Sequence, residues 1–238
     1  WIFVLSICIV SVLIHCAKSS IEKKQEEAPV INTGNIKNVD EALKYYQERW
    51  GDNNSKTKIR LEKIVSNEDL KYLVFFEELE DLYLLNSKNI TDDGMKYLEN
   101  ITNITHLVIS GTNITIVGLS KLKNAKKLKS LGITPNIYDN DLEIIADLFP
   151  NLKSLGLPDN NIKGPGIQYL KKLKSLHNLN LDGNPITDEM AKYFAGLQDM
   201  EIFLERTKVT PKGKAEILRI TKNCYVSIKE GDLAPPKE

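Results

Sequence analysis

Hydrophobic residues recur along this chain in a short phrase that repeats at an almost constant interval. The phrase is Leu-x-x-Leu-x-Leu, with Ile in some Leu positions, and its copies begin at Leu79, Ile104, Leu128, Leu152 and Leu176. Two contracted copies follow in phase at Met200/Ile202/Leu204 and Cys224/Val226/Ile228. Alternation of inward and outward positions is the period of a β-strand with one buried face, so each copy predicts one short strand.

A second apolar series runs in step with the first and predicts a helix in every unit. Its members are Leu98, Leu122, Ala146, Leu170, Phe194 and Leu218, which are evenly spaced along the chain. A single unit cannot bury a strand face and a helix face by itself, so neighbouring units must stack to cover them. The continuous register predicts one elongated domain without an internal boundary.

A polar position between strand and helix repeats with the same period. It is occupied by Thr112, Asn136, Asn160 and Asn184. A turn buried between stacked units leaves backbone N–H and C=O groups without strand partners, and an Asn amide can both donate to and accept from such groups. We therefore expect a structural role for this position.

These features resemble the leucine-rich repeat family, in the variety whose turn reads Ile-Thr-Asp-x-Gly-Leu. The matching turns are 90–95 (Ile-Thr-Asp-Asp-Gly-Met), 114–119 (Ile-Thr-Ile-Val-Gly-Leu) and 186–190 (Ile-Thr-Asp-Glu-Met). The resemblance covers residues 57 to 229, and departs from the cysteine-containing subtype because Thr or Asn stands at the polar turn position. It implies an α/β fold: a curved solenoid with a parallel sheet on the concave side and helices on the convex side.

Composition divides the chain into five segments. They are a leader (1–16), a polar tether (17–35), an N-terminal capping helix (36–54), the repeat solenoid (55–230) and a short tail (231–238). The capping helix is predicted because apolar residues fall on one helical face, and the first solenoid unit is degenerate. The short tail leaves the last strand edge open to pairing with another chain, unless charged residues prevent it.

The leader ends in a sequence that resembles the lipobox of bacterial lipoproteins, in which a Cys is acylated. That residue is Cys16, although His15 stands where a small residue normally precedes the Cys. The apolar run of the leader has about the length of a signal-peptide core and is short for a membrane-spanning helix. Signal cleavage near Ala17 and an uncleaved anchor are the two alternatives to acylation of Cys16. All three place the repeats outside the cytoplasm, in the cell envelope, with lipid anchoring as the first expectation.

Charge and cysteine content narrow the possible partners. The 238 residues contain 32 basic and 32 acidic side chains, and this balance argues against a nucleic-acid partner. Three cysteines are too few for the disulfide-rich flanks that extracellular animal-type repeat proteins commonly carry. We expect a bacterial protein without a cofactor.

The sequence offers little for catalysis or metal binding. His106 and His177 lie on strands three repeats apart and cannot share a metal ion, and no His–Asp pair is expected because Asp182 lies far along the strand from His177. Gly164-Pro165-Gly166 lacks the other residues of a nucleotide loop and is expected to be part of the repeat turn. The prediction is a protein that is not an enzyme.

Lysines gather near the helix-to-strand side of two units. They are Lys121, Lys123, Lys126, Lys127 and Lys129 in one unit, and Lys171, Lys172 and Lys174 in another. Such a stripe is either a solvated surface or a contact for anionic lipids or glycans.

The residues that alternate with the inward leucines must project from the concave sheet. The candidate binding residues are Asp81, Tyr83, His106, Val108, Ser130, Gly132, Ser154, Gly156, Asn178, Asn180, Phe203 and Tyr225. Glycine within a strand often marks close approach of a ligand, and aromatic anchors around a shallow centre suit recognition of a protein or glycan. We therefore expect a monomeric binding scaffold. The alternative is a structural spacer that self-associates through its exposed terminal strand.

Overall fold

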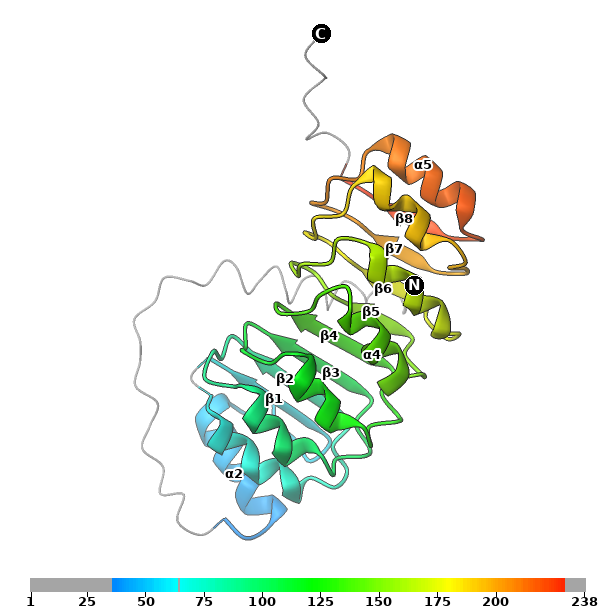
Figure 1. The fold of residues 1–238 in the computed structure, drawn as a ribbon. Helices are drawn as coiled ribbons and strands as arrows, with labels where there is room; N and C mark the ends of the chain where they lie inside the picture. Colours follow the sequence, from blue (N-terminus) through cyan, green and yellow to red (C-terminus); the bar gives the residue numbers. More distant parts are fainter. Residues whose placement is uncertain (1–35, 64, 230–238) are drawn as a thin grey trace.

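Eight short parallel strands lie side by side in chain order and form one sheet in the computed structural model, which describes residues 36–63 and 65–229. The strands are β1 (Lys58–Glu62), β2 (Asp81–Leu85), β3 (His106–Ser110), β4 (Ser130–Thr134), β5 (Ser154–Gly156), β6 (Asn178–Asn180), β7 (Glu201–Phe203) and β8 (Tyr225–Ser227). Figure 1 shows this order from the N-terminal to the C-terminal end. The expectations for the leader, the tether, the tail and Cys16 concern residues outside the described part.

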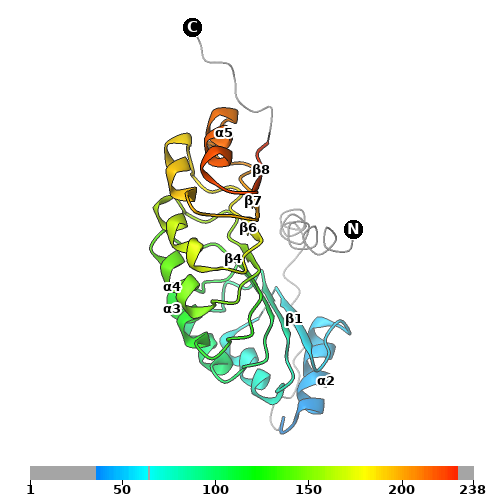
Figure 2. The same cartoon turned by 90° about the vertical axis from the view of Figure 1, so that its right-hand side faces the viewer.

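Helical segments connect successive strands on one side of the sheet. They are η1 (Asn67–Phe75), η2 (Asp92–Leu98), α3 (Ile116–Leu119) continued by η3 (Ser120–Leu122), α4 (Asp141–Leu148), η4 (Pro165–Lys172), η5 (Asp188–Phe194) and α5 (Pro211–Ile220). Figure 2 shows the strands on the inner side of a curved arc and these segments on the outer side. The predicted solenoid, with a concave parallel sheet and a convex helical side, is confirmed.

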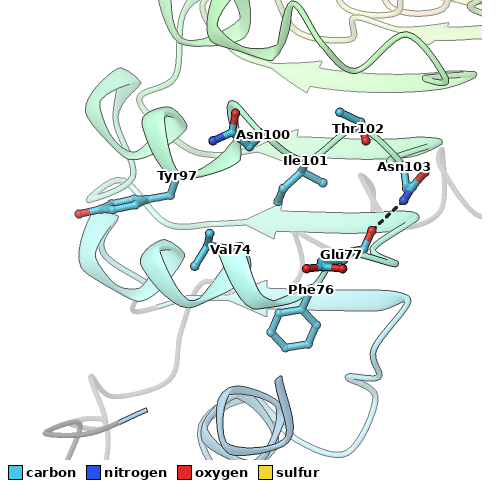
Figure 3. A pocket seen from close by; sticks show the side chains of 8 residues that line it. All are labelled: Val74, Phe76, Glu77, Tyr97, Asn100, Ile101, Thr102 and Asn103. Carbon is cyan, nitrogen blue, oxygen red and sulfur yellow. Dashed lines mark hydrogen bonds between the residues drawn. The ribbon is translucent and has the colours of Figure 1, made fainter. Parts of the chain in front are cut away.

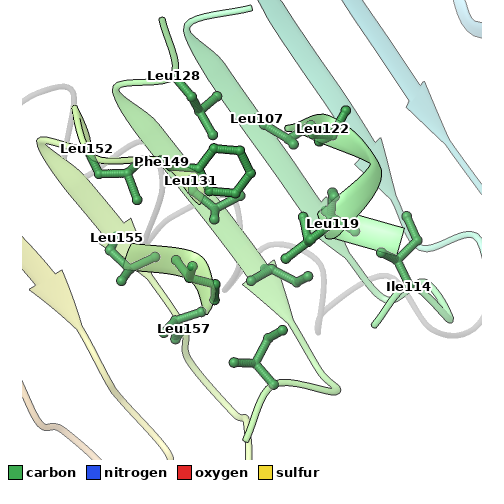
Figure 4. Close-up of a cluster of buried hydrophobic side chains, with 14 of the residues drawn as sticks. Leu107, Ile114, Leu119, Leu122, Leu128, Leu131, Phe149, Leu152, Leu155 and Leu157 are labelled. Atoms are coloured by element: carbon green, nitrogen blue, oxygen red, sulfur yellow. The ribbon is translucent and has the colours of Figure 1, made fainter. Parts of the chain in front are cut away.

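Leucine and isoleucine side chains stack from strand to strand in one continuous column. Leu107, Leu131 and Leu155 are paired in register with their neighbours, and all three are buried. The column extends from Ile59 on β1 to Val226 on β8. In Figure 4 the strand leucines point toward Leu119, Leu122 and Phe149 from the convex side, so the core is a sandwich between the sheet and the helical segments.

The helical segments differ from the sequence prediction in two respects. Most of them are 3₁₀ helices, because a 3₁₀ helix rises more per residue and spans a short unit with fewer residues. The second difference lies in α5, where Leu218 is 41% exposed and the preceding residue, Ile217, is buried instead. Extrapolation of the constant interval from Phe194 to Leu218 was therefore wrong by one position, because one residue is missing from the contracted strand phrase between Met200 and Ile202, which precedes α5.

The buried polar turn position supplies hydrogen bonds between units. Asn160 donates to the backbone oxygen of Ile133 at 2.9 Å and accepts from the backbone nitrogen of Ile137 at 2.8 Å. Asn184 repeats the arrangement, with donation to Leu157 O at 2.7 Å and acceptance from Ile162 N at 3.0 Å. The expected structural role of the amide is therefore confirmed at these two positions.

A second set of polar contacts joins the start of one helical segment to the next unit. The carboxylate of Asp92 accepts from the backbone nitrogen and the hydroxyl of Thr115, both at 2.7 Å. Asp188 does the same for Thr210, at 2.8 and 2.6 Å. Asn67 holds the equivalent position in the unit before Asp92. Its Oδ1 accepts from the backbone nitrogen of Thr91 at 3.0 Å, and its Nδ2 donates to the Thr91 hydroxyl at 2.9 Å.

The same contacts explain the glycine of the repeat turn. A Cβ on Gly118 would lie 2.4 Å from Asp92 Oδ1, and one on Gly213 would lie 2.0 Å from Asp188 Oδ1. Gly94 is opposed in the same way by Asn67, at 2.4 Å. The glycine is therefore required by the polar side chain of the preceding unit, which occupies the space of its missing side chain.

Where the polar residue is absent, the glycine of the following unit is absent too. Ile116 stands in the place of Asp92 one unit later, and Leu142 then stands in the place of Gly118. Likewise Gly164 takes the acidic position and is followed by Met190, whose Cβ would lie 2.7 Å from a Cβ on Gly164. These junctions are thus filled either by a carboxylate or amide opposite glycine, or by an apolar side chain. Gly166 differs, because a Cβ there would lie 2.1 Å from the backbone oxygen of Asp139.

The N-terminal end of the sheet is covered by α2 (Val39–Trp50). Asn38 caps this helix by accepting from the backbone nitrogens of Asp40 and Glu41, and Tyr45 and Tyr46 are buried on its inner face. The hydroxyl of Tyr45 donates to the Asp69 carboxylate. Among the described residues, none of the helices has the length and apolar content that crossing a membrane requires.

We expect Gly118→Ala to destabilise the fold by about 1–3 kcal/mol, because the new methyl group overlaps Asp92. Gly132→Ala is the matched control, since a Cβ there meets nothing closer than the two Val108 methyls at 3.7 Å. Urea unfolding of both variants measures the difference. Adding Asp92→Ala should cost less in the Gly118→Ala background than alone. Equal midpoints for Gly118→Ala and Gly132→Ala would contradict this account.

Candidate functional site

All twelve predicted binding residues fall into two adjacent rows that cross the concave sheet. Strand pairing gives the first row as Asp81, His106, Ser130, Ser154, Asn178, Glu201 and Tyr225. The second row is Tyr83, Val108, Gly132, Gly156, Asn180, Phe203 and Ser227. We call these two rows, with Lys58 and Arg60 of β1 in register at their start, the concave strip.

The centre of the concave strip is recessed. His106 and Tyr225 are exposed, and Asp81, Tyr83, Ser130, Ser154 and Phe203 are half-buried. Val108, Gly132, Gly156, Asn178 and Asn180 are buried, which differs from the exposure that simple alternation predicts. Adjacent strands are only about 4.8 Å apart, so side chains of neighbouring strands cover one another across the rows.

At the N-terminal end of the strip, the Tyr83 ring lies between two basic side chains. Lys58 Nζ is 5.3 Å from the ring centroid and Arg60 Cζ is 6.0 Å from it. Burial raises the pKa of the Tyr83 hydroxyl, the charge of Asp81 raises it further, and Arg60 opposes the shift. The phenol is therefore kept protonated and can donate a hydrogen bond to a partner.

A His–Asp pair is present beside Tyr83, so the expectation that none would form was wrong. His106 Nδ1 lies 2.9 Å from Asp81 Oδ1, because the two residues are directly in register on β2 and β3. Thr105 Oγ1 lies 2.8 Å from the same ring nitrogen. A catalytic triad needs the hydroxyl and the carboxylate on opposite ring nitrogens, so this pair lacks the required geometry.

At the C-terminal end, polar side chains of the strip are held by hydrogen bonds. Asn178 donates to Glu201 at 3.4 Å, and Asn180 donates to Asp182 at 3.2 Å. Asp182 also accepts from the backbone nitrogen of Glu205 at 2.8 Å. Burial raises the pKa of the Asp182 carboxyl, and the Glu205 N–H bond opposes that rise.

An ion pair that the sequence did not indicate crosses two units beside this end. Arg206 Nη1 lies 2.6 Å from Asp159 Oδ1, although 47 residues separate them in the chain. The pair passes over Gly183, where a Cβ would lie 2.2 Å from Asp159 Oδ1. Both charged residues have positive φ in turns after their strands, a geometry that strand alternation alone does not predict.

Lys58 and Arg60 were also missed, because the list of outward residues began at β2. The degenerate first unit contains Ile59 and Leu61 at inward positions, and Lys58 and Arg60 alternate with them on β1. Extending the alternation by one unit would have found both residues. At the start of the concave strip they lie beside acidic residues, since Arg60 pairs with Glu62 at 3.2 Å and Lys58 is in register with Asp81.

A hollow of about 290 Å³ lies away from the strip, beside η1 and η2. It is lined by Val74, Phe76, Glu77, Tyr97, Asn100, Ile101, Thr102 and Asn103. Figure 3 shows Asn103 at one side, where its amide donates to the backbone oxygen of Glu77 at 2.8 Å. None of the predicted binding residues lines this hollow.

Metal ligation finds no support in the described residues. Their His, Cys, Asp and Glu side chains do not gather in groups of three or more that would hold a metal ion. Gly166 lies in the repeat turn, where its backbone nitrogen donates to Asp139 at 2.9 Å. This fits the structural role expected for the Gly-Pro-Gly sequence.

Comparison with known proteins agrees with the geometry of the units. A family model described as a leucine-rich repeat matches residues 100–123 and 172–195, and each segment contains one strand, its turn and the following helical segment. The solved structure of internalin C2 from Listeria monocytogenes is 17% identical, with a TM-score of 0.50 over 73% of this chain and 80% of that one.

A second internalin structure from the same organism is 16% identical, with a TM-score of 0.47 over 82% of this chain and 60% of that one. At these identities the likeness to internalin C2 concerns the fold alone. The phased units, their stacked leucines and the matched repeat model together identify the fold as a leucine-rich repeat solenoid.

Proposed function

We propose that this protein is a non-enzymatic binding scaffold that recognises a protein or glycan through the concave strip. The observation that carries the proposal is the register of the sheet, which collects all twelve candidate residues into two neighbouring rows. Small residues occupy the middle of both rows, and Tyr83 and Phe203 stand on either side. A partner can therefore approach the sheet closely between two aromatic anchors.

Charge is distributed unevenly along the strip and favours one orientation of a partner. At its start, Lys58 and Arg60 are balanced by Asp81 and Glu62, whereas Glu201 and Glu205 lie near its end. An uneven distribution of charge along an interface contributes to specificity by penalising the reversed orientation. A partner with basic groups facing β7 fits this distribution.

The polar side chains near β6 and β7 are already ordered in the free protein. Asn180 both donates to Asp182 and accepts from its backbone nitrogen, at 3.2 and 2.9 Å. Side chains that are held before binding lose less conformational entropy when a partner arrives. This pre-organisation supports a binding role for the C-terminal half of the strip.

For location, we propose a bacterial cell envelope, with the protein anchored outside the cytoplasm through a lipid on Cys16. The support is the lipobox-like sequence and the polar tether that follows it. Secretion after cleavage near Ala17 is the second choice.

The alternative function is a structural spacer that self-associates through its terminal strand. Among the described residues β8 pairs only with β7, and Tyr225 beside that edge is 60% exposed. A strand with one unpaired edge is a template for another strand. We nevertheless expect a monomer, because the exposed Lys222 and Lys229 add charge next to this edge.

We expect Tyr83→Ala and Phe203→Ala to weaken binding at least tenfold, on the order of the loss at an aromatic hot spot. Ligands selected on the wild-type protein from a random peptide display library and a glycan array serve as probes, and titration calorimetry gives the affinities. Val117→Ala is the control, because Val117 is 63% exposed and lies in α3 on the convex side. Unchanged affinities in both strip variants, with their folding intact, would contradict the proposal.

Sedimentation equilibrium of the wild-type protein should give the mass of one chain over a wide concentration range. Reversible association that a Pro substitution at Val226 abolishes, while the unfolding transition persists, would instead support the spacer.

Mass spectrometry of the mature N-terminus, purified from membranes of a bacterial host, should find a diacylglycerol-modified Cys16. An intact leader in a cytosolic fraction would refute the proposed location, and a Cys16→Ala variant provides the unmodified reference.

A further inference from the structure

Lysines cluster on the edge of the solenoid where the chain enters β4, β5 and β6. We call the set Lys126, Lys127, Lys129, Lys153 and Lys174 the basic edge. All five are exposed, and they belong to the loops 123–129, 149–153 and 173–177. Three sequence-distant loops are thus brought side by side by the stacking of β4, β5 and β6.

These lysines have no acidic neighbours in their own loops, since none of the three loops contains Asp or Glu. Lys126 Nζ donates to the backbone oxygen of Leu148 at 3.1 Å, and Lys127 Nζ donates to the amide oxygen of Asn103 at 2.7 Å. Both acceptors are neutral, as is the backbone oxygen of Lys171 that accepts from Lys174 Nζ at 2.9 Å, so the hydrogen-bond partners of these three ammonium groups do not compensate their charge.

Neighbouring lysines that do have acidic partners lie outside the basic edge. Lys172 contacts Glu143 at 3.0 Å and Asp147 at 2.9 Å, and these two carboxylates raise its pKa. Lys123 pairs with Glu99 at 3.6 Å. Among residues 36–63 and 65–229, the fold therefore pairs Lys123 and Lys172 of this region with carboxylates, and the five lysines of the basic edge form no such ion pair.

Hydrogen bonds between the loops hold the array in place. Asn151 Nδ2 donates to the backbone oxygen of Lys126 at 2.9 Å, and Asn124 Nδ2 donates to that of Glu99 at 3.2 Å. The backbone nitrogen of Lys153 donates to the backbone oxygen of Lys129 at 2.8 Å. The loops are thus fixed at the strand spacing, roughly 4.8 Å per unit.

Acidic residues limit the basic edge at both ends. Glu77, Glu78 and Glu80 lie where the chain enters β2, and Asp199 is exposed where it enters β7. A flat anionic membrane laid on this side would face these carboxylates as well as the lysines. The uncompensated stretch, about 10 Å across three strands, instead matches a short anionic segment.

The composition of the basic edge narrows the chemistry of that segment. Its loops contain no Arg, and their single Phe, Tyr or Trp residue is Phe149, which is only 1% exposed. Nucleic-acid bases and many sugars are held by exposed faces of such large aromatic rings, which these loops lack. Lysine ammonium groups act as point charges and suit dispersed carboxylates.

We propose that the basic edge binds an acidic peptide segment of a protein partner. Lys129 immediately precedes Ser130 and Lys153 immediately precedes Ser154, so the edge borders the first row of the concave strip. One partner can occupy the strip and extend an acidic segment over its margin. The inference rests on the proposed function, because it takes the partner to be a protein. It adds that this protein carries a negatively charged segment.

The test uses a fluorescein-labelled glutamate-rich peptide and measures its anisotropy with the full chain. Wild-type protein should bind at low ionic strength and lose affinity as salt is added. The triple variant K126Q/K129Q/K153Q should bind roughly tenfold more weakly, as expected for three exposed charge pairs.

The matched control is K88Q/K163Q/K208Q, which changes net charge equally. These three exposed lysines lie in strand-to-helix turns on the opposite edge, and we expect less than a twofold change.

Any of the following results would overturn the proposal: absence of peptide binding by the wild type, equal losses in the two triple variants, or tighter binding of a single-stranded oligonucleotide or of anionic vesicles than of the peptide. Val117→Ala, on the convex side, should leave peptide binding unchanged. Loss of peptide binding in Tyr83→Ala would place the peptide on the concave strip and would also overturn the proposal. Failure of the concave-strip experiment alone leaves the basic edge supported, so the two ideas are tested separately.

Discussion

Every unit of this solenoid depends on polar contacts from its neighbour. The strand ladder joins units along the sheet, Asn160 and Asn184 join them at the turn, and Asp92 and Asp188 join them at the start of the helical segments. Buried backbone groups without partners are costly, so these bonds restrict how two units can be placed against each other. Congruent stacking is therefore the constraint from which the remaining features follow.

The glycine of the repeat turn illustrates how strict this constraint is. Gly118 and Gly213 are opposite Asp92 and Asp188, whereas Leu142 and Met190 follow units that lack the acidic residue. A repeat consensus treats each position as independent, but the structure shows that the glycine of one unit and the carboxylate of the preceding unit form a pair. Substitution of either member alone leaves overlap or an empty space.

Much of this fold could be predicted from the sequence, because the inward-facing apolar residues recur at a nearly constant interval. The strands, their parallel order and the column through Leu107, Leu131 and Leu155 follow from that period. Leu218 was misplaced because the interval from β6 to β7 is one residue shorter than the usual interval, which shifts every later position by one. The interval from β2 to β3 is one residue longer, so the overall length of the repeat region hides this shift. The His106–Asp81 contact was missed because it depends on register between strands instead of distance along one strand.

The candidate site was harder to predict from the sequence, because the residue types at its outward positions do not repeat from unit to unit. Alternation placed the twelve residues on one face, but their burial depends on the sizes of neighbouring side chains in adjacent strands. Val108 is buried although it lies outside the main core, and Asn178 and Asn180 are buried beside small residues. The contribution of Arg60 to the surroundings of Tyr83 likewise comes from the adjacent strand.

The charged side chains on the two edges of the sheet differ in whether contacts between stacked units explain their presence. On the edge where strands end, Asp92 and Asp188 are engaged by the following unit, and Asp159 is paired with Arg206. Those carboxylates are explained by the stability of the fold. On the edge where strands begin, the inter-unit bonds come from neutral amides such as Asn151 and from lysines, which bond through their backbone atoms or, at Lys126 and Lys127, donate to neutral oxygens. Their positive charges, repeated over three neighbouring loops without a compensating acid in those loops, are the charges that an external partner can use.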